Sequence, residues 1–186
     1  MSKKIITESI KKHGDVLKSI DKNSILNASE AIIKTLRNGK KIFWCGNGGS
    51  ASQANHLSAE LVGGMYQKKI KPFQSICLNV DTAFITAWSN DDSFDNIFVR
   101  QLEALGNNED VVMLLSTSGN SQNIINAIKS AKSKGMKFIS LTGNYGGKAK
   151  KLGGININVN TDDTQRIQEM HLLIGHIICD LVEKSL

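Results

Sequence analysis

Two amphipathic stretches open the chain, each with apolar residues three or four positions apart. That spacing places the apolar residues on one face of a helix, so the first forty residues predict two helices. Asn23 or Ser24 can cap the second helix, and Gly39 can supply the left-handed residue that follows its end. The positions sharing a face are Ile6, Ile10, His13, Leu17 and Ile20 in the first stretch and Ile25, Ala28, Ile32 and Leu36 in the second.

After Gly39 the pattern changes to short apolar runs that alternate with longer helical segments. The runs are rich in β-branched or aromatic residues, which favours strands. Strands buried on both faces and separated by helices predict an α/β fold, with a doubly wound, five-stranded parallel sheet and helices on both of its faces. The two opening helices are additional to that arrangement. The predicted strands are Ile42 to Cys45, Ser75 to Leu78, Val111 to Leu115, Phe138 to Leu141 and Ile155 to Val159.

The last predicted helix, Thr164 to Glu183, is apolar nearly all round between Leu172 and Val182. Such a helix is buried on more than one side, which a small domain achieves most easily by packing against another subunit. We therefore expect an oligomer.

The 186 residues are 40% hydrophobic and 22% charged, as in ordinary globular proteins, and we expect one domain, residues 1–186. The longest apolar run, Leu172 to Cys179, is too short to span a bilayer, and the amphipathic start does not resemble a secretory signal. Cys45, Cys77 and Cys179 are odd in number and far apart. They argue against disulfides and a thiolate zinc site, and they favour the cytoplasm.

The formal net charge of +6 comes from small lysine groups spread along the chain, Lys68 to Lys71 among them. Solvated lysines are the simplest interpretation, and attraction of an anionic substrate is the next. Nucleic-acid binding ranks last, because only 5% of the residues are aromatic and few could serve as stacking platforms.

A serine-rich loop, Ser116-Thr117-Ser118-Gly119-Asn120-Ser121, follows the third predicted strand, and a helix from Gln122 to Lys134 comes next. In a parallel sheet this loop lies at the carboxyl end of its strand, where open α/β folds bind ligands. Four hydroxyls and the free N–H groups of a helix N-terminus suit a phosphate. A capped turn is the alternative, but a cap needs one hydroxyl and not four.

A glycine-rich loop, Gly46-Asn47-Gly48-Gly49-Ser50, follows the first strand and with Ala51 matches a loose dinucleotide-binding fingerprint. The acidic residue that should support this fingerprint is missing at the end of the second strand, since Asp81 comes too late. No Gly-Lys pair is followed by Ser or Thr, so the Walker pattern is absent. We interpret residues 47–50 as a close backbone approach to a small polar ligand.

Candidate acid/base and metal-binding side chains lie on two predicted helices. His56 and Glu60 are four residues apart and project from one helix face, which suits a metal, an acid/base pair or an ordinary surface pair. The last helix adds Gln168, His171 and His176. A lone buried histidine is most often a core residue. Several polar groups in one buried helix favour a site, because each costs on the order of 1–3 kcal/mol if it is buried without a partner.

The acidic stretch Asn90-Asp91-Asp92 follows a predicted short helix at Asp81 to Ala87. Such side chains either cap a helix or turn, or recognise the hydroxyls of a sugar. Both interpretations stay open.

In combination and in this order, Cys45 to Ser50, His56 with Glu60, Ser116 to Ser121, and Arg166 to His171 with His176 resemble the phosphoheptose isomerases, a branch of the sugar isomerase (SIS) domain family. The resemblance covers essentially the whole chain, the two leading helices included. Serine loops occur throughout phosphosugar-binding domains. The pairing of His56 and Glu60 with Gln168 and His176 points to the heptose branch.

The resemblance implies conversion of sedoheptulose 7-phosphate to D-glycero-D-manno-heptose 7-phosphate, an early step toward the heptose of bacterial lipopolysaccharide or capsule. It also implies a homotetramer with its sites near subunit interfaces, and one zinc ion per subunit held by residues matching His56, Glu60, Gln168 and His176. The implied substrate contacts are Asn47, Gly48, Gly49, Asn90, Asp91, Ser116, Thr117, Ser118, Ser121 and Gln168.

The implied reaction needs groups that move protons. A carbonyl passes between C2 and C1 through an enediolate, and we assign Glu60 as the base and His176 as the partner acid/base. A positioned acid/base group contributes roughly 10²–10⁴-fold, whereas enzymes usually reach 10⁶-fold or more, so the enediolate oxygen also needs stabilisation. A zinc Lewis acid would provide it.

Two positions depart from the family pattern. Gln165 precedes Arg166 where an aspartate is expected, and Gly64-Met65 stands where a basic residue often follows Glu60-Leu61. The region around Gln67 to Lys71 is also longer. These departures bear on substrate preference more than on reaction type.

Two other functions fit the same fold. A non-catalytic tetrameric SIS protein binds the replication initiator in some bacteria, but the retained His56, Glu60, Gln168 and His176 favour an enzyme. A sugar-phosphate-sensing regulatory domain would carry the serine loop without that set and usually an attached DNA-binding module, for which we expect no room.

Overall fold

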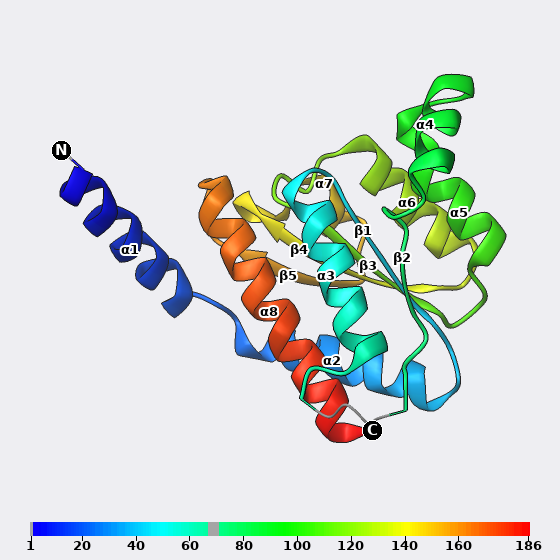
Figure 1. Cartoon of the computed structure of the whole chain (residues 1–186), viewed down its shortest axis with the longest axis horizontal. Coiled ribbons are helices and arrows are strands. Elements are labelled where there is room, and N and C mark those ends of the chain that lie inside the picture. Colours follow the sequence, from blue (N-terminus) through cyan, green and yellow to red (C-terminus); the bar gives the residue numbers. More distant parts are fainter. Residues whose placement is uncertain (1, 67–70) are drawn as a thin grey trace.

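The structure, a computed structural model, describes residues 2–66 and 71–186. The basic and lengthened region at Gln67 to Lys71 therefore lies, apart from Lys71, outside the described residues. Figure 1 shows a central sheet with helices in front of it and behind it. In chain order the elements are α1 (Ser2–Lys18), α2 (Lys22–Arg37), β1 (Ile42–Gly46), α3 (Gly49–Gly63), β2 (Ser75–Cys77), α4 (Thr82–Asp91), η1 (Phe94–Asn96), α5 (Ile97–Leu105), β3 (Val111–Ser116), α6 (Gln122–Ser133), β4 (Lys137–Gly143), η2 (Asn144–Gly146), α7 (Gly147–Lys151), β5 (Ile155–Val159) and α8 (Thr164–Ser185).

The five strands form one parallel sheet in the order β2-β1-β3-β4-β5, which confirms the predicted strands to within two residues at each end. The chain leaves β1 to form β2 on one side and then returns to form β3 on the other side. The connections on the two sides of the boundary between β1 and β3 therefore run in opposite directions along the sheet. In open α/β sheets of this order, ligands bind at that switch point, outside the carboxyl ends of the strands.

The central strands β1 and β3 are buried along their whole length, on both faces, as the prediction of a doubly wound sheet requires. On β1, Ile42 and Trp44 pack into the apolar cluster with α2, α3 and α8. The alternate residues Phe43 and Cys45 pack into the second cluster, with α5, α6 and α7. Side chains of a strand alternate between the faces of a sheet, so one short apolar run supplies both cores.

The start of α2 differs from the prediction of Asn23 or Ser24 as its cap. Asp21 is the N-cap residue, and its carboxylate accepts hydrogen bonds from the Asn23 backbone N–H at 3.0 Å and the Ser24 hydroxyl at 2.5 Å. An ionised carboxylate accepts from both donors and suits the positive end of the helix dipole. Gly39 has a φ of +68°, which confirms the left-handed residue after the helix.

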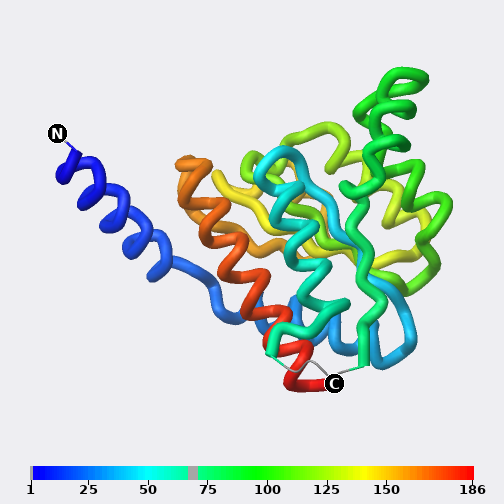
Figure 2. The backbone as a smooth tube through the Cα atoms, in the orientation of Figure 1, coloured from blue at the N-terminus to red at the C-terminus, as the bar shows by residue number. Residues whose placement is uncertain are grey.

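Helix α1 projects from the body of the protein and joins it through a short link (Figures 1 and 2). None of its residues is buried, and the apolar side chains of Ile6 and Ile10 are 58% and 68% exposed. Its amphipathic pattern therefore presents an uncovered apolar face in a single chain.

Helix α8 lies against α2 and α3 on one face of the sheet (Figure 1). Its outer side keeps Ile177 37% exposed, so one chain does not cover its whole circumference. None of the helices in residues 2–66 and 71–186 combines the length and the hydropathy of a membrane-spanning helix.

Candidate active site

The serine loop lies where it is predicted, directly beyond β3 and before α6. The Ser116 hydroxyl accepts a hydrogen bond from the Gly119 N–H, and the Ser118 hydroxyl accepts one from the Asn120 N–H, both at 3.1 Å. Within the described residues the hydroxyls of Thr117 and Ser121 make no hydrogen bond. Two of the four hydroxyls therefore hold the loop in shape. The other two remain available to an anion, together with the first N–H groups of α6.

The glycine loop occupies the neighbouring position, between β1 and α3. Gly48 has a φ of +54°, which a residue with a side chain adopts only with strain. A Cβ on Gly49 would lie 2.6 Å from Nε2 of Gln168. The side chain of Gln168, from α8, therefore lies against the glycine loop at the start of α3. The approach of this loop to a small polar ligand stays a prediction.

Three of the predicted metal-binding residues meet between α3 and α8. Nε2 of His56 lies 2.8 Å from Nε2 of His176 and 3.4 Å from Oε1 of Glu60. One ligand atom from each of the three residues lies within 4.8 Å of the others. The meeting depends on Gly175, where a Cβ would lie 2.3 Å from Cδ1 of Leu57, so that α8 can pack closely against α3.

The donor set of this cluster fits zinc. Two imidazole nitrogens and a carboxylate are common zinc ligands, and three protein ligands leave a position open, as in catalytic zinc sites. The His56 side chain is 47% exposed, so the cluster is accessible in the single chain. Cys179 is not part of the set: burial, with smaller contributions from the charges of Glu60 and Glu183, raises the pKa of its thiol to about 12. It therefore remains a protonated core residue.

His171 is a core residue and not a member of the cluster. It is fully buried, and neither ring nitrogen has a hydrogen-bond partner of good geometry in the described residues. Burial lowers the pKa of His171 to about 4, against a smaller opposing contribution from the Thr142 backbone. The ring is therefore neutral near neutral pH, and the last helix contributes Gln168 and His176 to the face toward α3.

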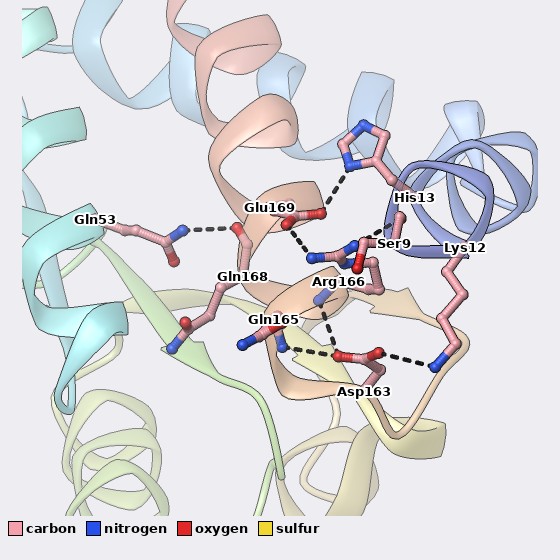
Figure 3. A network of polar contacts seen from close by, with 9 residues as sticks. All are labelled: Ser9, Lys12, His13, Gln53, Asp163, Gln165, Arg166, Gln168 and Glu169. Atoms are coloured by element: carbon pink, nitrogen blue, oxygen red, sulfur yellow. Dashed lines mark hydrogen bonds and ion pairs between the residues drawn. The ribbon is translucent and has the colours of Figure 1, made fainter. Parts of the chain in front are cut away.

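The first turns of α8 present different side chains to α3 and to α1 (Figure 3). Toward α1, Arg166 donates to the Ser9 carbonyl at 2.7 Å and to Oε1 of Glu169 at 2.5 Å. Oε2 of Glu169 lies 2.7 Å from Nδ1 of His13. This network anchors α1 to the helix that carries Gln168 and His176.

Gln53 is a residue of this region that the sequence analysis missed. Its side-chain N–H donates to the backbone carbonyl of Gln168 at 2.6 Å (Figure 3), and it precedes His56 by one turn on α3. Its position three residues before His56 was the available signal. The contact ties α3 and α8 together near the glycine loop.

Asn90 and Asp91 lie in the last turn of α4, so the predicted helix end at Ala87 is wrong. The helix continues to Asp91, and Asp92 follows as its C-cap residue. Both side chains are exposed, and Nδ2 of Asn90 donates to Oδ1 of Asp91 at 2.9 Å. The cap at the start of this helix is Asp81, whose carboxylate accepts from the Phe84 N–H.

The two departures from the family pattern have structural positions. Gly64 follows α3 with a φ of +82°, and its N–H donates to the Glu60 carbonyl at 2.9 Å. A left-handed residue at this point ends the helix, which explains a glycine there. Gln165 lies exposed in the first turn of α8, where its N–H donates to Asp163.

A hollow elsewhere on the molecule is lined by Arg37, Lys40, Pro72 and Leu186, among others. Lys40 and Pro72 precede β1 and β2, so this hollow lies at the amino ends of the strands. The loops and the His56 cluster are favoured as the site, because ligands of open α/β sheets bind at the carboxyl ends.

Comparison with known proteins agrees with the fold. The pattern of the SIS domain family matches residues 7–143. The chain is 48% identical to a phosphoheptose isomerase from Helicobacter pylori (strain P12), over 95% of this chain and 90% of that protein. A solved phosphoheptose isomerase from Francisella tularensis is 33% identical, with 99% of each chain covered and a TM-score of 0.94. Another, from Neisseria gonorrhoeae, is 37% identical over 98% of this chain and 97% of that one, with a TM-score of 0.89.

A five-stranded doubly wound sheet with a serine loop at its switch point defines a sugar isomerase domain. The chain belongs to the SIS domain family, and within it to the phosphoheptose isomerases. It is an isomerase enzyme.

Proposed function

We propose that this enzyme converts sedoheptulose 7-phosphate to D-glycero-D-manno-heptose 7-phosphate, in heptose biosynthesis for lipopolysaccharide or capsule. The convergence of His56, Glu60 and His176, in a chain that also has a serine loop at the switch point, carries the proposal. A regulatory or binding domain would have no use for such a cluster. The relatives named above are phosphoheptose isomerases, and this chain matches them over nearly their whole length.

The phosphate binds at the switch point in this proposal. The hydroxyls of Thr117 and Ser121 are free within the described residues, and the N-terminus of α6 adds N–H donors and a favourable dipole. His56 lies seven residues beyond Gly49 on α3, about 10 Å along the helix axis. That separation suits an extended sugar with its phosphate at the loops and its carbonyl end at the cluster. The proposed substrate contacts are Asn47, Gly48, Gly49, Asn90, Asp91, Ser116, Thr117, Ser118, Ser121 and Gln168.

Zinc is the proposed cofactor, one ion per subunit, with His56, Glu60 and His176 as ligands. When bound there it supplies a Lewis acid that stabilises negative charge on the oxygen of an enediolate. Gln168 is the fourth ligand implied by the family resemblance. Its amide lies beside Gly49 in the structure, which favours a substrate contact over a metal ligand for this residue.

Glu60 and His176 are the proposed proton carriers. Glu60 takes the proton from the carbon beside the carbonyl, and His176 serves the neighbouring oxygen or carbon as acid and base. The two side chains come from different helices and both contact His56, so they can act on two adjacent carbons of one substrate. The proton returned to the neighbouring carbon completes the isomerisation without any net oxidation.

We also propose that the enzyme is a cytoplasmic homotetramer of single-domain subunits, residues 1–186, with sites near the interfaces. The exposed apolar face of α1 and the partly exposed Ile177 of α8 support association. The three cysteines are buried free thiols, which supports the cytoplasm.

Turnover of sedoheptulose 7-phosphate, followed as ketose-to-aldose conversion, tests the function. We expect activity that a chelator removes and zinc restores. Glu60→Gln and His176→Ala should each lower kcat on the order of 10²–10⁴-fold, while Glu103→Gln, an exposed glutamate on α5, leaves it unchanged. Unchanged turnover in both site variants would remove the proposed roles. A zinc-loaded wild type without turnover would favour the alternative, a non-catalytic partner of the replication initiator.

A further inference from the structure

A reciprocal pair of side-chain amides joins the two loops at the switch point. Nδ2 of Asn47 donates to Oδ1 of Asn123 at 2.8 Å, and Nδ2 of Asn123 donates to Oδ1 of Asn47 at 2.8 Å. Asn47 follows β1, and Asn123 lies in the first turn of α6, just after the serine loop. The pair therefore joins the carboxyl ends of the neighbouring strands β1 and β3, which lie at the centre of the sheet in Figure 1.

The main chain of α6 fixes which way the pair faces. Oδ1 of Asn123 also accepts a hydrogen bond from the Ile124 backbone N–H at 2.9 Å, so that atom must be the oxygen and its partner the nitrogen. Through the reciprocal bonds this determines the orientation of the Asn47 amide. Asn47 is left with one N–H and one oxygen lone pair that have no partner within the described residues. Together they match a sugar hydroxyl, which both donates and accepts.

Burial separates the roles of the two residues. Asn123 is 1% exposed, so its side chain is covered from a ligand that arrives from solvent. Asn47 is half-buried, so part of its side chain is open to solvent. The side chain of Asn123 can therefore act on a ligand only through Asn47.

A second amide holds the same loop from the other side. Asn79, just beyond β2, accepts from the Gly46 N–H at 3.1 Å and donates to the Gly46 carbonyl at 2.9 Å. Gly46 and Asn47 are thus tied to β2 through Asn79 and to α6 through Asn123. The polarity and position of Asn47 are set before any ligand arrives, which reduces the ordering cost of binding.

We propose that Asn123 is a positioning residue, which orients the Asn47 amide toward the phosphosugar and joins the glycine and serine loops into one binding site. This inference rests on the proposed function, in which Asn47 contacts the substrate. The sequence offers a signal in retrospect, because a polar residue at the second position of a helix that is otherwise apolar on its inner face needs a partner.

A double-mutant cycle with Asn123→Ala, Asn47→Ala and the double variant tests the proposal. In the wild-type background Asn123→Ala should lower kcat/KM for sedoheptulose 7-phosphate roughly 10- to 100-fold, as small displacements of positioning groups do. In the Asn47→Ala background it should have an effect of less than about twofold, because the residue through which it acts is gone. Asn126→Ala, which removes another amide one turn further along α6, is the matched control and should leave kcat/KM unchanged.

Thermal unfolding of the same variants separates positioning from structure. If Asn123 only supports α6, its removal lowers the melting temperature and lowers kcat/KM equally in both backgrounds, which would overturn the proposal. Asn123→Asp provides a second variant that keeps the size and suits the helix N-terminus, while it removes the N–H that Asn47 accepts. Its added charge repels phosphate alike in both backgrounds, so only a smaller effect in the Asn47→Ala background supports positioning.

Calorimetric binding of sedoheptulose 7-phosphate keeps this inference distinct from the proposed function. A wild type that binds the sugar phosphate without turnover contradicts the isomerisation. The same double-mutant cycle, measured as Kd in place of kcat/KM, still tests Asn123. A wild type that neither binds nor converts it overturns both. If the wild type is active but the effects of Asn123→Ala and Asn47→Ala on kcat/KM simply add in the double variant, only the inference about Asn123 is overturned.

Discussion

At the residue scale, the surroundings of each histidine decide what it can do. His56 and His176 bring their Nε2 atoms within 2.8 Å of each other next to the Glu60 carboxylate, in an accessible position. His171, on the same helix as His176, is fully buried away from that cluster. Residue type alone does not distinguish these imidazoles; the partners that the fold provides do.

Removal of His56 should weaken zinc binding. We expect zinc-loaded wild type to keep about one ion per chain on dialysis, and His56→Ala to bind it at least roughly 10- to 100-fold more weakly, since loss of even an outer-shell partner has that effect. Metal content and a competitive chelator titration measure the change. His13→Ala removes a histidine outside the cluster and should retain the metal. Equal zinc affinity in both variants would exclude the cluster as the site.

Acid should destabilise the fold through His171. Its folded-state pKa of about 4 lies below the unfolded value of 6.5, so the unfolded chain takes up the proton first as the pH falls. The contribution to stability is complete above pH 6.5 and is lost between pH 6.5 and 4, by about 3 kcal/mol. Denaturant unfolding across this range should show a shallower decline for His171→Gln than for wild type. Parallel declines would contradict the assignment.

At the element scale, α8 connects the site to the rest of the chain. Its second turn touches the glycine loop through Gln168, its middle brings His176 to α3, and its other side contacts α1 through Arg166 and Glu169. The start of this helix therefore affects both the site and the projecting helix.

The N-cap of α8 should contribute to its stability. Asp163 accepts from the Gln165 and Arg166 N–H groups at 3.2 and 3.4 Å, whereas its 3.8 Å ion pair with Lys12 is largely exposed and weak. Asp163→Ala should lower the free energy of unfolding by about 0.5–2 kcal/mol. Asp163→Asn, which caps equally well, should lower it by only a few tenths. Chemical denaturation compares them; equal losses would place the effect in the ion pair instead.

At the scale of the whole molecule, α1 is a helix whose apolar face a single chain leaves uncovered. Its apolar residues match the helical period, yet none of them is buried, and the helix projects from the body of the protein in Figures 1 and 2. An isolated helix with one uncovered apolar face is costly in water, and a second copy of the chain can cover it.

Charges on the apolar face of α1 should break the oligomer. We expect the wild type to run as a tetramer in light scattering coupled to size-exclusion chromatography, and Ile6→Glu combined with Ile10→Glu to shift it to smaller species, because burial of two carboxylates is strongly unfavourable. Lys11→Glu, a charge change on an exposed position of the same helix, is the control. A tetramer that persists in the double variant would show that this face is not the interface.

Much of the fold was predictable from the sequence. Apolar runs such as Val111 to Leu115 are short, and their alternation with helical segments implies a parallel sheet. Helix ends were less predictable: Asp21 replaced Asn23 or Ser24 as the cap of α2, and α4 continued past Ala87. A cap depends on the local conformation of several polar residues that compete for the same N–H groups.

The candidate site was predictable in kind but not in geometry. Serine hydroxyls at a strand end and the spacing of His56 and Glu60 indicate phosphate and acid/base chemistry from residue type alone. The contacts of Gln53 with Gln168 and of Asn47 with Asn123 join residues 115 and 76 positions apart, and no local pattern encodes such pairs.

The sequence by itself determined the order of the elements, the two buried faces of the central strands and the chemical character of the loops, because these follow from local periodicity and side-chain type. The tertiary structure decided which side chains meet. Close packing of α8 on α3 at Gly175 brings His176 to His56, and the strand order brings Asn47 to Asn123 across the switch point. Both meetings depend on how distant helices and strands pack, which is a property of the whole chain and not of any segment.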